Sequence, residues 1–209
     1  MMLVLSLLVV LISLSVHEFA HALVAWLFGD DTAKRLGRLT LNPLKHIDPF
    51  GTVLLPLLLA GSSYATGGMV PVFGYAKPVP VNFRNLRPRK LGIILVAFAG
   101  PFSNFCIAFV SALMVVKFHW HGFWQNFWIL CFSLNLLLAI FNLVPIPPLD
   151  GSRIVSGFLP ESLAVQYNRM QFLGFLLILL LLQTRFFDQL YRYGLHLFEK
   201  MFQAFSGHA

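Results

Sequence analysis

The sequence predicts an all-α polytopic membrane protein with about four to six transmembrane helices and a small β-like hairpin insertion. Of its 209 residues, 58% are hydrophobic and only 11% are charged, whereas soluble proteins carry roughly 25% charged residues. So few charges could not cover the surface of a soluble fold, while lipid accepts apolar faces on every helix. The apolar residues also gather into stretches long enough to cross a bilayer.

The first span is predicted over residues 2–28, where polar side chains are few. At about 1.5 Å per residue, a helix of this length crosses a hydrocarbon core of about 30 Å. We expect the segment to be retained rather than cleaved as a signal peptide, because no Lys or Arg precedes the apolar run.

The next apolar stretch, within residues 51–65, is short and contains Pro56, so a re-entrant segment competes with an extra span. Nine of the fifteen Lys and Arg residues lie in the surrounding region, at Lys34, Arg35, Arg38, Lys45, Lys77, Arg84, Arg87, Arg89 and Lys90. Basic residues gather in cytoplasmic loops. We therefore expect both flanks of the stretch to be cytoplasmic.

Residues 69–81 mix Val and aromatic residues with Pro and Gly, which favours an edge strand or hairpin over a helix. Further spans are predicted near residues 91–116, 123–144 and 166–183. The mixed composition of residues 186–209 favours an interfacial amphipathic tail, and a poor final span is the alternative. The sequence thus divides into a membrane core, 1–185, and a C-terminal tail, 186–209.

The net charge of +7 fits basic residues that flank membrane spans, and we expect no binding of nucleic acid. The expected partner of the apolar surface is the lipid bilayer. We therefore predict a multi-pass protein of the cell membrane.

The chemistry is predicted from His17, Glu18 and His21, which fit the pattern H-E-x-x-H inside the first span. Residues four apart lie above one another on a helix, so both imidazoles can reach one metal ion. Glu18 can act on the attacking water without being a ligand. Three ionisable groups within one turn are costly in lipid unless they line a wet cavity or bind an ion.

A catalytic zinc takes three protein ligands, and the sequence leaves Asp48 and Asp150 as acidic candidates for the third. Asp150 follows a span that is broken by three prolines, and such a break at membrane depth must face protein or a cavity. A turn at the membrane surface is the alternative. For His46 and Asp48, a solvated loop is the favoured interpretation.

These motifs resemble the site-2 protease family of intramembrane zinc metalloproteases, in its minimal type without a PDZ or CBS domain. The matching pieces are the H-E-x-x-H pattern, residues 142–151 in the form N-x-x-P-x-x-x-L-D-G, and the segment 99–104, AGPFSN. The resemblance implies one Zn²⁺ held by His17, His21 and Asp150, with Glu18 as the catalytic acid and base. It also implies a transmembrane protein as substrate. The histidines lie in the C-terminal half of the first span, which leads into the basic region, so we expect the active site to open toward the cytoplasmic side.

Within the same motifs, Asn142 and Asn104 are the candidate substrate-positioning residues. The loop 69–81 is a candidate for pairing with an extended substrate, and a purely structural hairpin is the alternative.

Two other functions stay open at this point. A membrane metal-ion transporter would also place His and Asp within spans, but it would favour ligand sets repeated along a path. A catalytically silent membrane scaffold is the other open alternative, although all the motif residues are intact here. A membrane desaturase or hydroxylase would need several His-rich boxes to build a di-iron centre, and only one short box is present.

Overall fold

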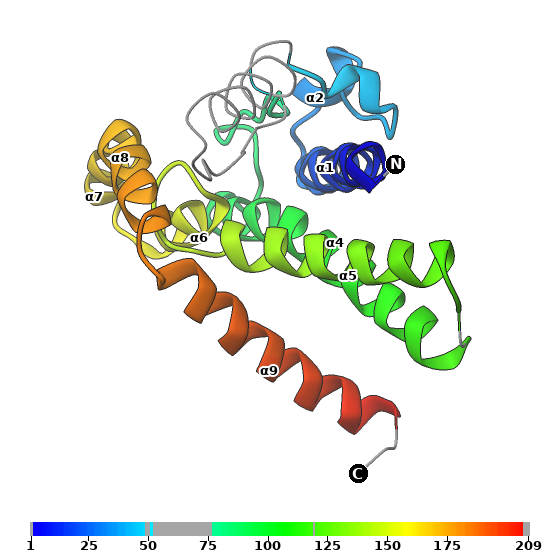
Figure 1. The fold of residues 1–209 in the computed structure, drawn as a ribbon. Coiled ribbons are helices and arrows are strands. Elements are labelled where there is room, and N and C mark those ends of the chain that lie inside the picture. The colour runs from blue at the N-terminus through cyan, green and yellow to red at the C-terminus, as the bar shows by residue number, and fades with distance from the viewer. Residues whose placement is uncertain (1, 49–50, 52–76, 119, 207–209) are drawn as a thin grey trace, which may run out of the picture.

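The computed structural model describes residues 2–48, 51, 77–118 and 120–206. Every regular element among these residues is helical (Figure 1). The predicted β-like hairpin is not supported, because residues 77–81 form no strand and residues 69–76 lie outside the described part. Nearly all of the predicted re-entrant segment, 51–65, lies outside it as well.

Three long apolar helices form the centre of the fold: α1 (Met2–Leu27), α4 (Arg89–Lys117) and α5 (Phe123–Asn142). By length and composition, each of them is able to cross a membrane. Helix α4 packs against both α1 and α5. The connection from α4 to α5 is short, so these two helices are antiparallel neighbours.

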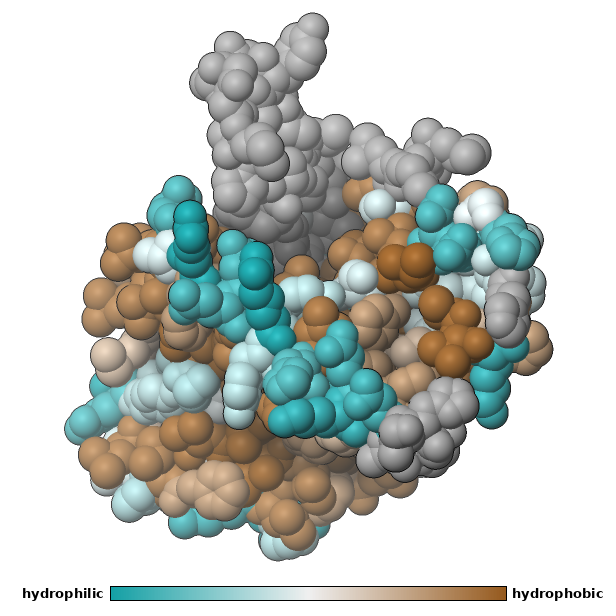
Figure 2. Space-filling model, turned by 60° about the horizontal axis from the view of Figure 1, so that its bottom comes forward, coloured by the Kyte–Doolittle hydropathy of each residue, from teal (hydrophilic) through white to brown (hydrophobic). Residues whose placement is uncertain are grey.

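A fourth crossing is formed only if α7 (Glu161–Arg169) and α8 (Gln171–Leu182) are counted as one span, because the two helices are bent by 56° at their junction. The described residues therefore contain three candidate spans, or up to four, against the predicted four to six. Large hydrophobic side chains are exposed on these helices, among them Leu8, Ile12, Phe172 and Leu180. Figure 2 shows broad hydrophobic areas on one face of the molecule, as expected of a membrane protein.

Small residues bring the helices close together. Ala25 of α1 packs with Leu86 and Val96 in one buried cluster, and Ala108 of α4 packs with Leu136 of α5 in another. Membrane helices lack a hydrophobic driving force toward one another, so close approach at small residues and the resulting van der Waals contact stabilise their association.

The described part of the connection after α1 contains α2 (Thr32–Arg35) and the 3₁₀ turn η1 (Pro43–Lys45). The Asn42 side chain accepts from the N–H of Leu44 and caps η1, which agrees with the predicted turn chemistry. The prediction of a solvated loop is wrong for His46, which is only 2% exposed. Its Nε2 donates to the carbonyl of Thr40 at 2.8 Å.

Asp30 fastens this connection to the segment that precedes α4. Its carboxylate accepts from the backbone N–H of Asn82 at 2.7 Å and from the Asn85 side chain at 2.9 Å. The N–H of Arg87 also donates to the carbonyl of Phe28 at 2.9 Å. The end of α1 and the start of α4 are thereby held at the same end of the molecule.

Helix α6 (Asp150–Phe158) follows α5 after seven irregular residues and packs on α4. The contact is close at Gly157, where a Cβ would collide with Ile94 of α4. At Gly151 a Cβ would collide with the carbonyl of Leu143. Gly151 thus allows the start of α6 to lie against the backbone that follows α5, and Gly157 allows its end to lie against α4.

The tail forms one helix, α9 (Phe186–Ser206), which runs below α4 and α5 in Figure 1. Phe198 is buried against Ala108 and Leu136, and Gly194 allows close contact with Ile140. The helix also carries the charged residues Asp188, Arg192, Glu199 and Lys200. The C-terminal segment is therefore packed on the central helices through its apolar side.

Candidate metal centre

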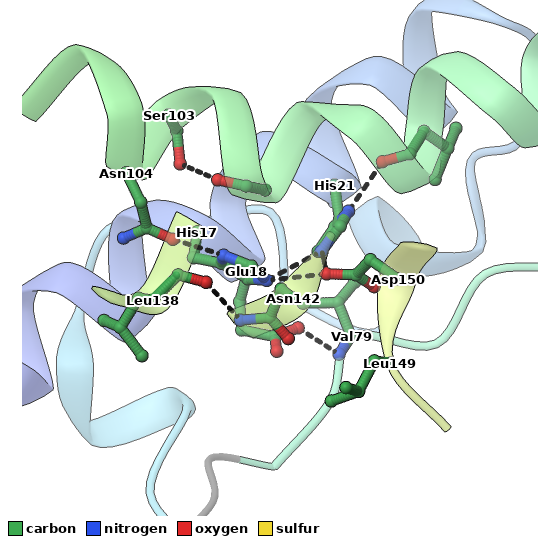
Figure 3. Close-up of polar contacts among 12 residues, drawn as sticks. His17, Glu18, His21, Val79, Ser103, Asn104, Leu138, Asn142, Leu149 and Asp150 are labelled. Carbon is green, nitrogen blue, oxygen red and sulfur yellow. Dashed lines mark hydrogen bonds and ion pairs between the residues drawn. The ribbon is translucent and has the colours of Figure 1, made fainter. Parts of the chain in front are cut away.

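His17 and His21 lie one turn apart on α1, with their Nε2 atoms 3.0 Å from each other. Asp150, the first residue of α6, places Oδ2 at 3.1 Å from Nε2 of His17 and 3.2 Å from Nε2 of His21. Figure 3 shows the three side chains pointing toward one another. The structure thus brings together the three predicted ligands, although 133 positions separate His17 from Asp150.

The outer nitrogens of both imidazoles are held by acceptors. Nδ1 of His17 lies 2.6 Å from Oδ1 of Asn104, and Nδ1 of His21 lies 2.6 Å from the carbonyl oxygen of Val96. These oxygens accept hydrogen bonds, so each Nδ1 donates, and in the Nδ1–H tautomer the lone pair of Nε2 is on the side of Asp150.

This donor set fits a zinc ion. Two imidazole lone pairs and a carboxylate oxygen, all within 4.8 Å of one another and largely buried, repel one another unless a cation lies between them. Two His and one carboxylate are a known ligand set of catalytic zinc, and outer hydrogen bonds from the ring N–H groups typically orient such ligands. Among the described residues, this is the one group that could hold a metal ion.

Gly100 of α4 supplies the space for the imidazoles. A Cβ at this position would lie 2.6 Å from Nε2 of His17 and would collide with Nε2 of His21. The glycine of the AGPFSN segment is therefore required by the position of the two rings. Pro101, the next residue, is accommodated inside α4.

Glu18 lies beside the ligand cluster but outside it. Its Oε2 accepts a hydrogen bond of 2.7 Å from the backbone N–H of Val79. Glu18 and the three cluster residues line the same cavity, of about 660 Å³. A carboxylate in this position can exchange a proton with a molecule bound in the cavity.

The two predicted substrate-positioning residues lie in different places. Asn142, at the end of α5, lines the cavity, and its Nδ2 donates to the carbonyl of Leu138. Asn104 is 0% exposed and lies behind His17, with its Nδ2 bonded to Asn135. The structure therefore places Asn142, and not Asn104, on the cavity wall.

Asn135 of α5 is a buried polar residue that was not selected from the sequence. An amide in the middle of an apolar span was the available signal, since polar side chains within the membrane usually have a specific partner.

His46 and Asp48 do not lie with the three predicted ligands. His46 bonds to Thr40, and Oδ1 of Asp48 accepts from the N–H of Gly51.

Comparison with known proteins identifies the family. The profile of peptidase family M50 matches residues 5–121 and 114–182. The chain belongs to peptidase family M50. The resemblance to the site-2 proteases is thereby confirmed, and the enzyme is a zinc metalloprotease. Zinc as the cofactor follows from the same membership.

Named M50 relatives agree with this assignment. The chain is 42% identical over 183 residues to "Putative zinc metalloprotease YwhC" of Bacillus subtilis, a match that covers 83% of this chain and 78% of the relative. It is 36% identical over 179 residues to "Putative zinc metalloprotease Rip2" of Mycolicibacterium smegmatis, covering 83% of this chain and 64% of that protein. No solved structure matches the chain significantly.

Proposed function

We propose that this M50 enzyme is an intramembrane endopeptidase that hydrolyses peptide bonds of transmembrane proteins, with zinc held by His17, His21 and Asp150. The observation that carries the proposal is the position of His17 and His21 on α1, a helix able to cross a membrane, with Asp150 of α6 beside them. Leu27 ends α1 six residues after His21 and ten after His17, which corresponds to about 9 and 15 Å along the helix. A scissile bond at this depth lies within the bilayer or near its edge.

Glu18 is proposed as the catalytic acid and base. When bound, zinc supplies a Lewis acid that polarises the scissile carbonyl and favours ionisation of water. Oε2 of Glu18 would take a proton from the attacking water and return it to the leaving amide nitrogen. The cavity next to Glu18 provides room for an unwound substrate segment. Asn142 on the cavity wall would hold a carbonyl of that segment.

The site is proposed to open toward the cytoplasm. The hydrogen bond between Arg87 and Phe28 places the end of α1 and the start of α4 at one end of the molecule. That end carries the basic residues that flank the two helices, whereas Lys117 is the basic residue at the other end of α4. A strong excess of Lys and Arg on one side is typical of the cytoplasmic face.

The test is Glu18→Gln, compared with wild type in lipid nanodiscs for zinc content and for cleavage of a model transmembrane substrate. We expect cleavage to fall by about 10² to 10⁴-fold, the usual contribution of a catalytic acid or base, while zinc is retained. Glu161→Gln is the matched control, because Glu161 forms an exposed ion pair with Arg89 and neither residue lines the cavity. Equal cleavage by Glu18→Gln and wild type would refute the proposed role.

A further inference from the structure

Two buried asparagines connect the metal cluster to the backbone of α5. Asn104 of α4 and Asn135 of α5 are both 0% exposed. Nδ2 of Asn104 donates to Oδ1 of Asn135 at 2.9 Å, and Nδ2 of Asn135 donates to the carbonyl of Cys131 at 2.9 Å. With the contact of 2.6 Å between Asn104 and His17, this makes a continuous chain of hydrogen bonds.

The Cys131 carbonyl, at the end of this series of hydrogen bonds, determines which group donates in each bond. The Cys131 carbonyl can only accept, so Asn135 turns its NH₂ group toward Cys131 and its oxygen toward Asn104. Asn104 then donates to that oxygen, and its own oxygen faces His17. His17 must therefore donate from Nδ1, which leaves the lone pair of Nε2 directed at the metal cluster.

We propose that Asn135, acting through Asn104, is a positioning residue that fixes the tautomer and ring orientation of His17 for zinc binding. This inference rests on the proposed function, in which His17 is a zinc ligand. Without Asn135, Asn104 could rotate its amide and present NH₂ to His17. Nδ1 would then accept, and Nε2 would carry a proton in the direction of the metal.

The same hydrogen bonds explain why Asn104, unlike Asn142, does not line the cavity. Both polar groups of Asn104 are used inside the protein, and its side chain has no exposed surface for a substrate. Its effect on the reaction would therefore pass through His17. An interhelical bond that only held α4 and α5 together would not depend on which way the amide points.

The experiment measures the zinc affinity of the purified protein by competition with a chromophoric chelator, and the absorption spectrum of the Co²⁺-substituted protein. Asn135→Leu is expected to weaken zinc binding by about 10- to 100-fold, as loss of an outer hydrogen-bond partner of a ligand typically does, and to alter the Co²⁺ spectrum. Asn135→Asp should stay close to wild type. As a neutral acid in this buried position, it can accept from Asn104 and donate to Cys131.

Ser111→Ala is the matched control for the loss of a buried polar group. Ser111 lies on α4, is 1% exposed and donates only within its own helix, to the carbonyl of Ile107. Its substitution should leave zinc affinity and the Co²⁺ spectrum unchanged. Equal zinc affinity in Asn135→Leu and Ser111→Ala would overturn the inference, and so would equal losses in Asn135→Leu and Asn135→Asp.

A second set of variants, built on Asn104→Asp, distinguishes an effect on the orientation of His17 from an effect on helix packing. In Asn104→Asp, either carboxylate oxygen accepts from Nδ1 of His17, so the orientation no longer depends on Asn135. Adding Asn135→Leu to this variant should cause no further loss of zinc affinity. A further tenfold loss there would contradict the inference.

His17→Ala distinguishes the two proposals. If it binds zinc as tightly as wild type, the proposed ligand set fails. If it loses zinc while Asn135→Leu does not, the ligand set stands and the role of Asn135 fails.

Discussion

The backbone N–H of Val79 donates a hydrogen bond of 2.7 Å to Oε2 of Glu18, across 61 positions of the sequence. This bond holds the segment of residues 78–81 against the cavity of the metal centre (Figure 3). The segment is fixed on its other side by the guanidinium of Arg38, which donates to the carbonyl of Lys77 at 2.7 Å. The N–H of Lys77 donates to the carbonyl of His46 at 2.9 Å.

The first prediction concerns the hydrogen bond from Arg38 to the carbonyl of Lys77. Arg38 is 8% exposed, and Arg38→Met should leave the carbonyl of Lys77 without its charged donor, at a cost of about 1.5–3 kcal/mol. The segment should then open more often, and the backbone amides of Lys77 and Val79, which are hydrogen-bonded to His46 and Glu18, should exchange hydrogen several-fold faster.

Arg35→Met is the control for this prediction. Arg35 forms an exposed ion pair with Asp31, and such pairs contribute about 0–1 kcal/mol. Its removal should not change the rate of amide exchange at Lys77 and Val79. If these amides exchange at the same rate in Arg38→Met and Arg35→Met, Arg38 does not hold the segment.

The second prediction is that Gly100→Ala disrupts the metal centre. The added Cβ would lie 2.6 Å from Nε2 of His17 and would also collide with His21, so both rings must move. Because metal ligation tolerates changes of only about 0.2 Å, zinc content after purification should fall well below one ion per chain.

Gly194→Ala provides the comparison for Gly100→Ala. It introduces a Cβ that collides with Ile140 at the contact between α9 and α5, away from the ligands. It should lower thermal stability while zinc content stays at the wild-type level. Full zinc occupancy in Gly100→Ala would show that the rings do not need this space.

The third prediction is a dependence of stability on pH through Asp30. Burial alone would raise the pKa of this carboxyl, but hydrogen bonds from Thr32, Asn85 and Asn82 outweigh it and hold the pKa below its usual value of 3.8. The stabilisation is therefore present above about pH 4 and is lost as the pH falls through the lowered pKa.

Asp30→Asn should lower the melting temperature at pH 7 and should reduce the loss of stability between pH 5 and about pH 3. The measurement is thermal unfolding in detergent at each pH. Asp31→Asn, which removes only an exposed ion pair, should keep the wild-type pH dependence. A wild-type pH profile in Asp30→Asn would exclude Asp30 as the group responsible.

The sequence predicted the parts of the fold and site that depend on local pattern. The apolar runs predicted α1, α4 and α5, since hydropathy alone distinguishes a spanning helix. The spacing of His17 and His21 predicted their common face because four residues make about one helical turn. Asp150 could not be selected from Asp48 by spacing, and its choice depended on the family motif.

Other features depend on tertiary packing that no local pattern contains. The partner of Asn104 lies on a different helix, so its orientation away from the cavity could not be read from the AGPFSN segment. The burial of His46 likewise results from the way its loop folds back on Thr40. The β-branched residues near Val79 favoured a strand, but Val79 donates to a side chain instead of to a neighbouring strand.

The distance of 133 positions between His17 and Asp150 also sets the order of events during synthesis. The two imidazoles enter the membrane with the first helix, whereas the carboxylate is translated only after α4 and α5. At about 5–20 residues per second, the nascent chain exists for roughly 7 to 27 seconds with two of the proposed ligands and no third. Tight retention of zinc would then mark the moment at which biogenesis of the helical core is complete, and an immature chain would lack the means to cleave its neighbours.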